Sequence, residues 1–260
     1  MATPDTFRRF ESRAADYAAG RPTYPPTLVD ELLQRLKLQA GAVVADIGSG
    51  TGLFTQCLLQ RGLRVAAVEP GDDMRQTAES LLSRDPGFSS VNGTARATGL
   101  PDASVDAIFC AQAFHWFNEP PTLGEWRRIL RPGGTAVLIW NYQDETDAFV
   151  ADYLKLVRAS GPEARQTLAA SWSAHLDNVL FAPGEARMIS SSHRQELDFP
   201  GLVRRTSSTS YLPKQDDPRF AAIEEGLREI FARHQAGGQV YLSYRTVAVF
   251  GLLTAKPQSA

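Results

Sequence analysis

Three glycines at alternate positions follow an acidic residue early in this 260-residue chain. An apolar stretch ends at Asp46, the glycines are Gly48, Gly50 and Gly52, and a second apolar run spans Leu53 to Leu59. The pattern predicts a strand, a tight turn and a helix. Glycine has no Cβ, so the backbone can bend sharply there while a large molecule lies against it. Since the start of the helix also presents free N–H groups, we expect a cofactor-binding turn; an ordinary strand-to-helix turn is the alternative.

The glycine spacing separates two classes of cofactor. A dinucleotide fingerprint reads G-x-G-x-x-G, and after Gly48 and Gly50 the third position of that fingerprint holds Leu53. This disfavours a nicotinamide-dependent oxidoreductase. Glu69 ends the next apolar stretch, at close to the roughly 20 residues from the loop at which a carboxylate can accept hydrogen bonds from both hydroxyls of a ribose. The alternative for Glu69 is an ordinary surface residue at a strand end.

A second group of reactive side chains follows a strongly apolar stretch, Val105 to Gln112. Such a stretch is typical of a central parallel strand that is buried on both faces. Ligands bind outside the carboxyl ends of the strands in open α/β sheets, so His115 is well placed to meet a substrate. Its ordinary pKa near 6.5 suits a general base, although a structural histidine explains it equally well. Trp116 is more readily explained as part of a wall or of the core.

Further strands and helices are expected on both sides of this segment. Strands are predicted at 43–46, 64–68, 89–92, 135–140, 193–199 and 239–253, and helices at 51–61, 122–130, 147–159, 167–179, 202–212 and 217–235. The two last strands, joined after Gly237 and Gly238, would form an antiparallel edge hairpin. A leucine-rich amphipathic helix precedes the first strand and ends near Gly41.

Composition excludes several classes of protein. Hydrophobic residues make up 43% of the chain and charged residues 22%, as in an ordinary globular protein, and the net charge of −2 gives no basic field for a polyanion. Nucleic acid is therefore not expected as a partner. The two cysteines form neither a disulfide framework nor a zinc-site spacing, so no metal is expected. Without a signal-peptide pattern or a membrane-spanning run, we expect a cytoplasmic protein that has no membrane partner and is a monomer or a homodimer.

Several motifs in register resemble the class I S-adenosylmethionine-dependent methyltransferases. The D-x-G-x-G-x-G run that begins at Asp46 is similar to motif I of that family. The run from Gly93 to Asp106 is similar to a second family motif, with Thr94 in place of the acid that often binds the adenine amino group. The turn after Arg128 matches R-x-L-x-P-G-G, and the segment that begins at Tyr17 matches a Tyr-x-x-x-Arg-Pro-x-Tyr-Pro lead-in. The pair His115 and Trp116 looks like the small-molecule subgroup that includes the trans-aconitate methyltransferases.

The resemblance implies an α/β fold with a seven-stranded Rossmann-like sheet in the order 3-2-1-4-5-7-6, flanked by helices. It also implies an N-terminal helical lid at 1–40, a cofactor-binding core at 41–141, a cap insertion after strand 5 at 142–192, and the C-terminal part of the sheet at 193–260. The lid could instead be a packed N-terminal arm, and the cap a helical appendage without contact to ligand.

The implied activity is transfer of a methyl group from S-adenosylmethionine to a small-molecule acceptor, at a carboxylate or hydroxyl oxygen, with S-adenosylhomocysteine as product. The alternatives are a methyltransferase acting on RNA or protein, and a non-catalytic S-adenosylmethionine-binding protein. The implied catalytic residue is His115. The implied substrate residues are Tyr24, His115, Trp116 and Arg205. The implied cofactor residues are Tyr17, Arg21, Asp46, Gly48, Ser49, Gly50, Gly52, Glu69, Pro70, Met74, Thr94, Ala95 and Gln112.

Overall fold

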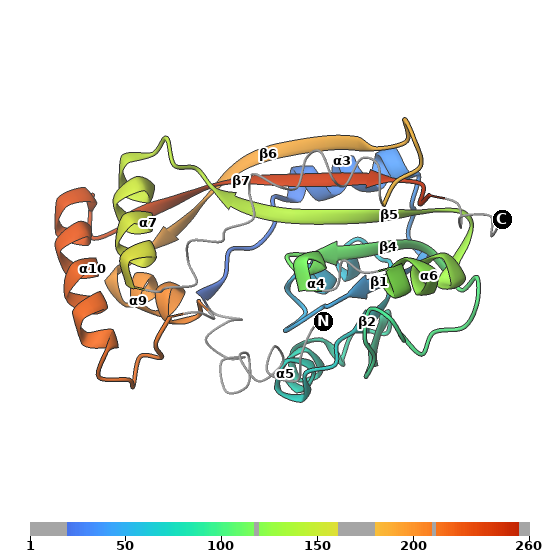
Figure 1. The fold of residues 1–260 in the computed structure, drawn as a ribbon, viewed down its shortest axis with the longest axis horizontal. Coiled ribbons are helices and arrows are strands. Elements are labelled where there is room, and N and C mark those ends of the chain that lie inside the picture. Colours follow the sequence, from blue (N-terminus) through green and yellow to red (C-terminus); the bar gives the residue numbers. More distant parts are fainter. Residues whose placement is uncertain (1–19, 117–119, 161–179, 210–211, 255–260) are drawn as a thin grey trace.

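The computed structural model describes residues 20–116, 120–160, 180–209 and 212–254, and its main feature is one seven-stranded sheet (Figure 1). The strand order is β3-β2-β1-β4-β5-β7-β6, which confirms the predicted order. The strands are β1 (Val43–Ile47), β2 (Arg64–Val68), β3 (Phe88–Val91), β4 (Val105–Ala111), β5 (Leu130–Gln143), β6 (Arg187–Leu197) and β7 (Val240–Gly251). The helices are α3 (Pro26–Leu36), α4 (Leu53–Leu59), α5 (Asp72–Leu82), α6 (Pro120–Ile129), α7 (Ala148–Ser160), α9 (Phe199–Ser207) and α10 (Phe220–His234), with a 3-10 turn η1 (Phe114–Trp116).

Strands β1 to β5 are mutually parallel, and the helices between them cover both faces of this half of the sheet. Neighbouring residues of β1 enter opposite cores because side chains alternate along a strand. Val44 packs with α3 and α4 on one face, and Ala45 packs with α6 on the other. This burial on both faces is why the parallel strands read as continuous apolar runs in the sequence.

The junction between α6 and β5 differs from its prediction. The strand starts at Leu130, five residues before the expected Thr135, and Leu130 pairs with Val105. The ladder then skips to the pairing of Thr135 with Ala107, so Pro132 to Gly134 form a bulge rather than a free turn.

The far edge of the sheet is antiparallel: β7 lies between β5 and β6 and pairs with both. The prediction of an antiparallel edge pair is therefore confirmed, and so are the two helices predicted between its strands, although no hairpin turn joins the strands directly. Helices α9 and α10 stand between β6 and β7, and Gly237 and Gly238 lie in a tight turn just before β7. The alternation of polar and apolar residues predicted the strand β6, but it did not indicate which strand pairs with it.

Helices α7, α9 and α10 form a separate layer at one end of the long strands β5, β6 and β7, away from β1 and β2 (Figure 1). They share one apolar core, which includes Tyr153 of α7, Leu202 of α9 and Leu227 of α10. We call these three helices the helical cap. Because α9 and α10 follow residue 193, the cap draws on both sides of the predicted domain boundary there. The boundaries of all four predicted segments remain predictions.

The described part of the N-terminal segment is packed rather than isolated. Helix α3 buries Leu28, Val29 and Leu32 in the core, and it lies beside β6. Among the described residues, no helix has the length and apolar character needed to cross a membrane. The predicted helix at 167–179 lies outside the described residues.

Candidate active site

The glycine loop runs from the end of β1 to the start of α4, and backbone geometry requires glycine in it. Gly48, Gly50 and Gly52 have φ angles of 72°, 56° and 84°, in the left-handed region that side chains disfavour. A Cβ on Gly52 would lie 2.6 Å from Cδ1 of Leu82, so this glycine lets the loop approach α5. A Cβ on Gly50 would meet no atom of the described residues within 4 Å, so none of these residues fills the space above it.

Glu69 connects the loop to the next crossover. Its Oε2 accepts a hydrogen bond from the N–H of Gly50 at 3.0 Å, and its Oε1 accepts one from the N–H of Gly71 at 2.8 Å. Burial raises the pKa of Glu69, and these two hydrogen bonds oppose the rise. Each carboxylate oxygen keeps a second acceptor position, so both oxygens can still accept from a ligand's paired hydroxyls. The carboxylate of Glu69, which was selected from its spacing in the sequence, thus lies directly beside the glycine loop. Its orientation is fixed by these two hydrogen bonds.

Asp46 is the most buried acid of the site, with an exposed fraction of 1%. Its Oδ2 accepts from the Thr55 hydroxyl at 2.7 Å, whereas its Oδ1 is buried and makes no hydrogen bond within the described structure. Burial raises its pKa to about 7, and the nearby charge of Glu69 adds to the rise. Such a group favours a cation or a donor close by, because either would stabilise its charged form.

The remaining predicted cofactor residues are spread around this loop, and their roles stay predictions. Met74 and Ala95 are buried, while Ser49 donates its N–H to the carbonyl of Val68 at 3.2 Å. Thr94 exchanges backbone hydrogen bonds with Ala97, so its segment is a tight turn. Pro70 lies between Glu69 and Gly71 at the carboxyl end of β2, and Tyr17 lies outside the described residues.

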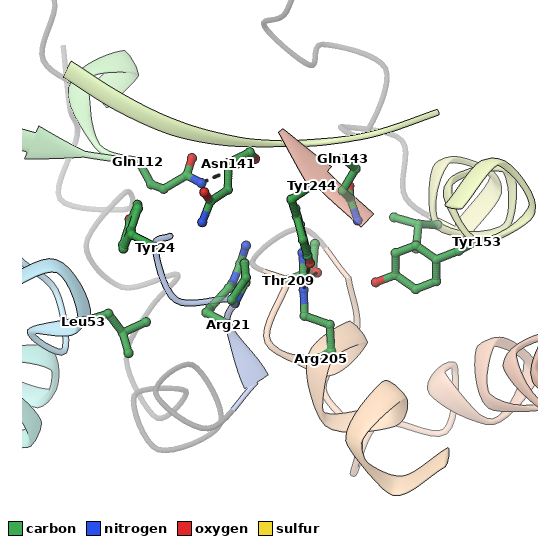
Figure 2. Close-up of a pocket in the computed structure, with 12 residues that line it drawn as sticks. Arg21, Tyr24, Leu53, Gln112, Asn141, Gln143, Tyr153, Arg205, Thr209 and Tyr244 are labelled. Carbon is green, nitrogen blue, oxygen red and sulfur yellow. Dashed lines mark hydrogen bonds between the residues drawn. The ribbon is translucent and has the colours of Figure 1, made fainter. Parts of the chain in front are cut away.

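A cavity of about 200 Å³ opens between the parallel half of the sheet and the helical cap (Figure 2). Leu53, the first residue of α4, links it directly to the glycine loop. Gln112 lines it from the end of β4, and its φ of 59° is unusual for a residue with a side chain. The described lining consists of Arg21, Pro22, Tyr24, Leu53, Gln112, Asn141, Gln143, Tyr153, Val157, Arg205, Thr209 and Tyr244.

Two of the four predicted substrate residues lie on this cavity and two do not. Tyr24 and Arg205 line it, and the ring of Tyr24 also packs edge-on against Phe54 at 4.9 Å between centroids. His115 and Trp116 are outside the described lining; their rings contact each other at 4.7 Å. Burial lowers the pKa of His115 to about 4, so its imidazole is neutral at pH 7 and is a weak base. A catalytic role for His115 stays a prediction that this geometry does not favour.

Comparison with known proteins adds an independent observation. Residues 45–138, which hold β1, the glycine loop, Glu69 and β4, match the model of a methyltransferase domain. By this match and by its strand order, the part of the chain at residues 45–138 is similar to the class I S-adenosylmethionine-dependent methyltransferases. The finer resemblance to the trans-aconitate subgroup is not shown by these matches.

Some similar proteins match only part of this chain, and others match nearly all of it. An uncharacterized methyltransferase of Mycobacterium tuberculosis is 38% identical over 156 residues, and this match spans 60% of the present chain and 61% of the relative. An uncharacterized methyltransferase-like protein of Schizosaccharomyces pombe is 27% identical over 95% of this chain and 96% of its own. A solved structure of a candidate type II methyltransferase from Anaeromyxobacter dehalogenans has a TM-score of 0.66 at 24% identity, covering 91% of this chain and 99% of its own. The last likeness concerns the fold.

Several residues of the cavity were missed by sequence reasoning. Asn141 lies on β5, donates to the carbonyl of Thr23 at 3.2 Å and accepts from Thr246 at 2.6 Å. Tyr244 is buried on β7, where its ring stacks on His193 at 5.3 Å. These residues belong to no local motif, and the cavity forms only where segments distant in the sequence meet. Among the described residues, no group of three or more metal-ligating side chains could hold a metal ion.

Proposed function

We propose that this protein transfers a methyl group from S-adenosylmethionine to a small-molecule acceptor, at a carboxylate or hydroxyl oxygen. The observation that carries the proposal is the Glu69 carboxylate, fixed by the N–H groups of Gly50 and Gly71 at the carboxyl ends of β1 and β2. This is where open α/β sheets bind ligands, and a carboxylate there suits a ribose. The similarity of residues 45–138 to a methyltransferase domain supports the same cofactor.

The residues of the loop fit this cofactor. Glu69 would bind the ribose hydroxyls, the open space above Gly50 would admit the body of the cofactor, and the unpaired Oδ1 of Asp46 would face its positive charge. The cofactor, when bound, supplies a methyl group on a positively charged sulfur. The two acids therefore give this end of the site the sign of charge that a cationic donor requires.

The cavity supports a small acceptor. It begins at Leu53, beside the glycine loop, and reaches to the cap. Its volume of about 200 Å³ is below the roughly 300–1,000 Å³ of pockets for drug-sized ligands. The protein's contribution to such a transfer would be to hold the acceptor in line with the methyl group and to exclude water. A methyltransferase acting on RNA or protein is the alternative, and turnover of either would replace the small molecule in this proposal.

The first experiment measures cofactor affinity in the wild type and in Glu69→Gln. Calorimetry with S-adenosylhomocysteine should show tight binding to the wild type, and NAD and NADP should not bind. The amide keeps the size of Glu69 but removes its charge and one acceptor, so we expect affinity to fall roughly 10- to 100-fold, as for loss of a hydrogen bond to a charged group.

Glu31→Gln on the exposed surface of α3 is the matched control and should leave affinity unchanged. Binding of NAD in place of the sulfur nucleotides, or unchanged affinity in Glu69→Gln, would contradict the assignment of the loop.

A further inference from the structure

A short segment before α3, residues 20–24, forms one wall of the cavity, and we call it the strap. The carbonyl of Gly20 accepts a hydrogen bond from Nε2 of Gln195 on β6 at 3.0 Å. The carbonyl of Thr23 accepts one from Nδ2 of Asn141 on β5 at 3.2 Å. The strap is therefore held to the sheet by amide side chains of two different strands. Its cavity-lining residues are Arg21, Pro22 and Tyr24 (Figure 2).

The strap lies against a polar band on one face of the sheet. Asn141 of β5 is paired with Thr246 of β7, and alternation along the strands places His193 of β6 on the same face. Toward one end of the strands this face belongs to the core under α3, with Ile139, and toward the other to the core of the cap, with Leu242. Thr246 is fully buried, so a polar group here is costly unless it has a partner.

Donor and acceptor roles in the band follow from one fixed point, the carbonyl of Thr23. A carbonyl only accepts, so Asn141 turns its Nδ2 toward Thr23 and its Oδ1 toward Thr246. That amide oxygen also only accepts, so the single hydroxyl proton of Thr246 points to it, at 2.6 Å. The hydroxyl oxygen of Thr246 is left to accept from Nδ1 of His193, 3.2 Å away. The imidazole must therefore carry its proton on Nδ1.

The surroundings of His193 agree with a neutral ring in this tautomer. Burial lowers the pKa of His193, and the carbonyl of Thr23 opposes that fall. The Nε2 atom is buried and has no hydrogen-bond partner within the described residues, so a proton on it would be a buried donor without an acceptor. The ring also stacks on Tyr244, which lines the cavity. His193 thus contacts the cavity wall without being part of the described lining.

We propose that His193 is a positioning residue of the acceptor cavity: through Thr246 and Asn141, its Nδ1–H holds the strap in place as one wall of that cavity. The role in methyl transfer rests on the proposed function, whereas the hydrogen-bond relay from His193 to Thr23 does not. The protein's contribution to such a transfer is to keep the acceptor in line with the methyl group, so a wall that shifts costs rate.

The first test determines which ring nitrogen of His193 carries the proton. NMR of the imidazole nitrogens at about pH 7.5 distinguishes Nδ1 from Nε2, and loss of a signal in His193→Asn identifies this residue among the four histidines. We expect a proton on Nδ1 and none on Nε2. A proton on Nε2, alone or together with one on Nδ1, would overturn the relay.

The second test uses Cys57 of α4 as a reporter of the strap. Burial raises the pKa of the Cys57 thiol and Arg61 opposes that rise, as does the backbone of Tyr24, so the thiol lies against the strap. The other cysteine, Cys110, is fully buried in β4. Modification of Cys57 by an aromatic disulfide reagent therefore measures local opening at the strap, and modification of Cys110 in the same sample measures opening of the core.

Two pairs of variants change the relay. Thr246→Val keeps the shape of the side chain but removes its hydroxyl, whereas Thr246→Ser keeps the hydroxyl. His193→Asn keeps a donor nitrogen near the position of Nδ1, whereas His193→Gln moves it to that of Nε2. The rate of Cys57 modification should rise roughly 5-fold in Thr246→Val and in His193→Gln, as for loss of one hydrogen bond, and less than 2-fold in the other two variants.

Thr98→Val is the matched control. Thr98 is as buried as Thr246, and its hydroxyl bonds to Glu125 of α6 on the opposite face of the sheet. This variant should destabilise the fold but change the Cys57 rate less than 2-fold, and Cys110 should react at least roughly 100-fold more slowly than Cys57 in every protein. An equal rise in Thr98→Val, or no rise in both Thr246→Val and His193→Gln, would refute the positioning role.

Binding of S-adenosylhomocysteine to the wild type, measured in parallel, separates this proposal from the proposed function. If that ligand does not bind, the proposed function fails, and the tautomer and the thiol rates still decide whether His193 holds the strap. If it binds and the Cys57 rates do not respond to the relay variants, the positioning role is refuted while the cofactor assignment stands. The pairs at Thr246 and His193 are independent, so one decides the outcome if a variant of the other does not fold.

Discussion

The two ends of the site carry opposite charge. The glycine-loop end holds the carboxylates of the buried Asp46 and the half-buried Glu69, and the cap end holds the guanidinium groups of Arg21 and Arg205. The first end is built within one continuous stretch of sequence, and the second is assembled from the N-terminal segment and α9. The difference teaches that a local motif encodes the acidic end, whereas tertiary contacts assemble the end that holds the arginines.

The largest expected effect tests the acidic end through Asp46→Asn. The folded-state pKa of Asp46 is raised from 3.8 to about 7, so the unfolded chain loses this proton first as pH rises. The contribution of Asp46 to stability is therefore highest below about pH 4, falls between pH 4 and 7, and is constant above. A shift of this size corresponds to about 4 kcal/mol, by which Asp46→Asn should be more stable than the wild type at pH 8.

Urea unfolding of both proteins at pH 5 and pH 8 measures this difference, with the exposed Asp30→Asn as control. The stability gain of Asp46→Asn should grow from pH 5 to pH 8, and that of Asp30→Asn should not. An equal gain at both pH values would mean that the buried charge costs nothing, and the contrast between the two ends would lose its acidic half.

Gly52→Ala tests how tightly the glycine-loop end is built. The φ of 84° costs a side chain roughly 1–2 kcal/mol, and the new Cβ would lie 2.6 Å from Leu82 and 3.3 Å from Ala78. We expect a loss of about 3 kcal/mol in the free energy of unfolding. Gly99→Ala, with a φ of 75° and no described atom within 4 Å of the added Cβ, isolates the backbone cost and should lose less. Equal losses in both variants would show that α5 yields to the added methyl group.

Gly226→Ala makes the matching test in the cap and should have the smallest effect. Its Cβ would lie 2.7 Å from Cδ1 of Leu156, nearly the same clash as at Gly52, but the backbone at Gly226 is ordinary helix. The end of a leucine side chain can move, and alanine favours a helix by roughly 1 kcal/mol over glycine. The net change in unfolding free energy should be below about 1 kcal/mol. A loss comparable to that of Gly52→Ala would show a cap as rigid as the loop.

The sequence predicted the strands of the sheet well, because a strand that is buried on both faces is a continuous apolar run in the sequence. Strand β2 was predicted to its exact bounds, and β4 to within one residue, since both are apolar on two faces. The strand order came from family resemblance. The bulge in β5 was mispredicted because it depends on pairing partners that hydrophobic periodicity does not specify. The two helices between β6 and β7 were predicted, because each has a periodic apolar pattern of its own.

The candidate site divides in the same way. Glu69 was found from its spacing to the glycines, because the strand–helix–strand geometry fixes that distance. Asn141 and Tyr244 were missed, since they meet their partners across 118 and 39 residues. His115 was favoured by its place after β4, but position at a strand end does not fix which way a side chain points.

The contacts that close the cavity also bear on the order in which the chain folds. Arg21 bonds to Ser208 across 187 residues, and the carbonyl of Gly20 accepts from Gln195 across 175. Contacts between residues so far apart in the sequence form late in folding, because closing the long loop between them costs entropy before the contact adds any stability. During synthesis the glycine loop and Glu69 can assemble as soon as β1 and β2 pair, whereas the acceptor cavity must wait for α9. A nascent chain would therefore complete the glycine-loop end first and the cavity last.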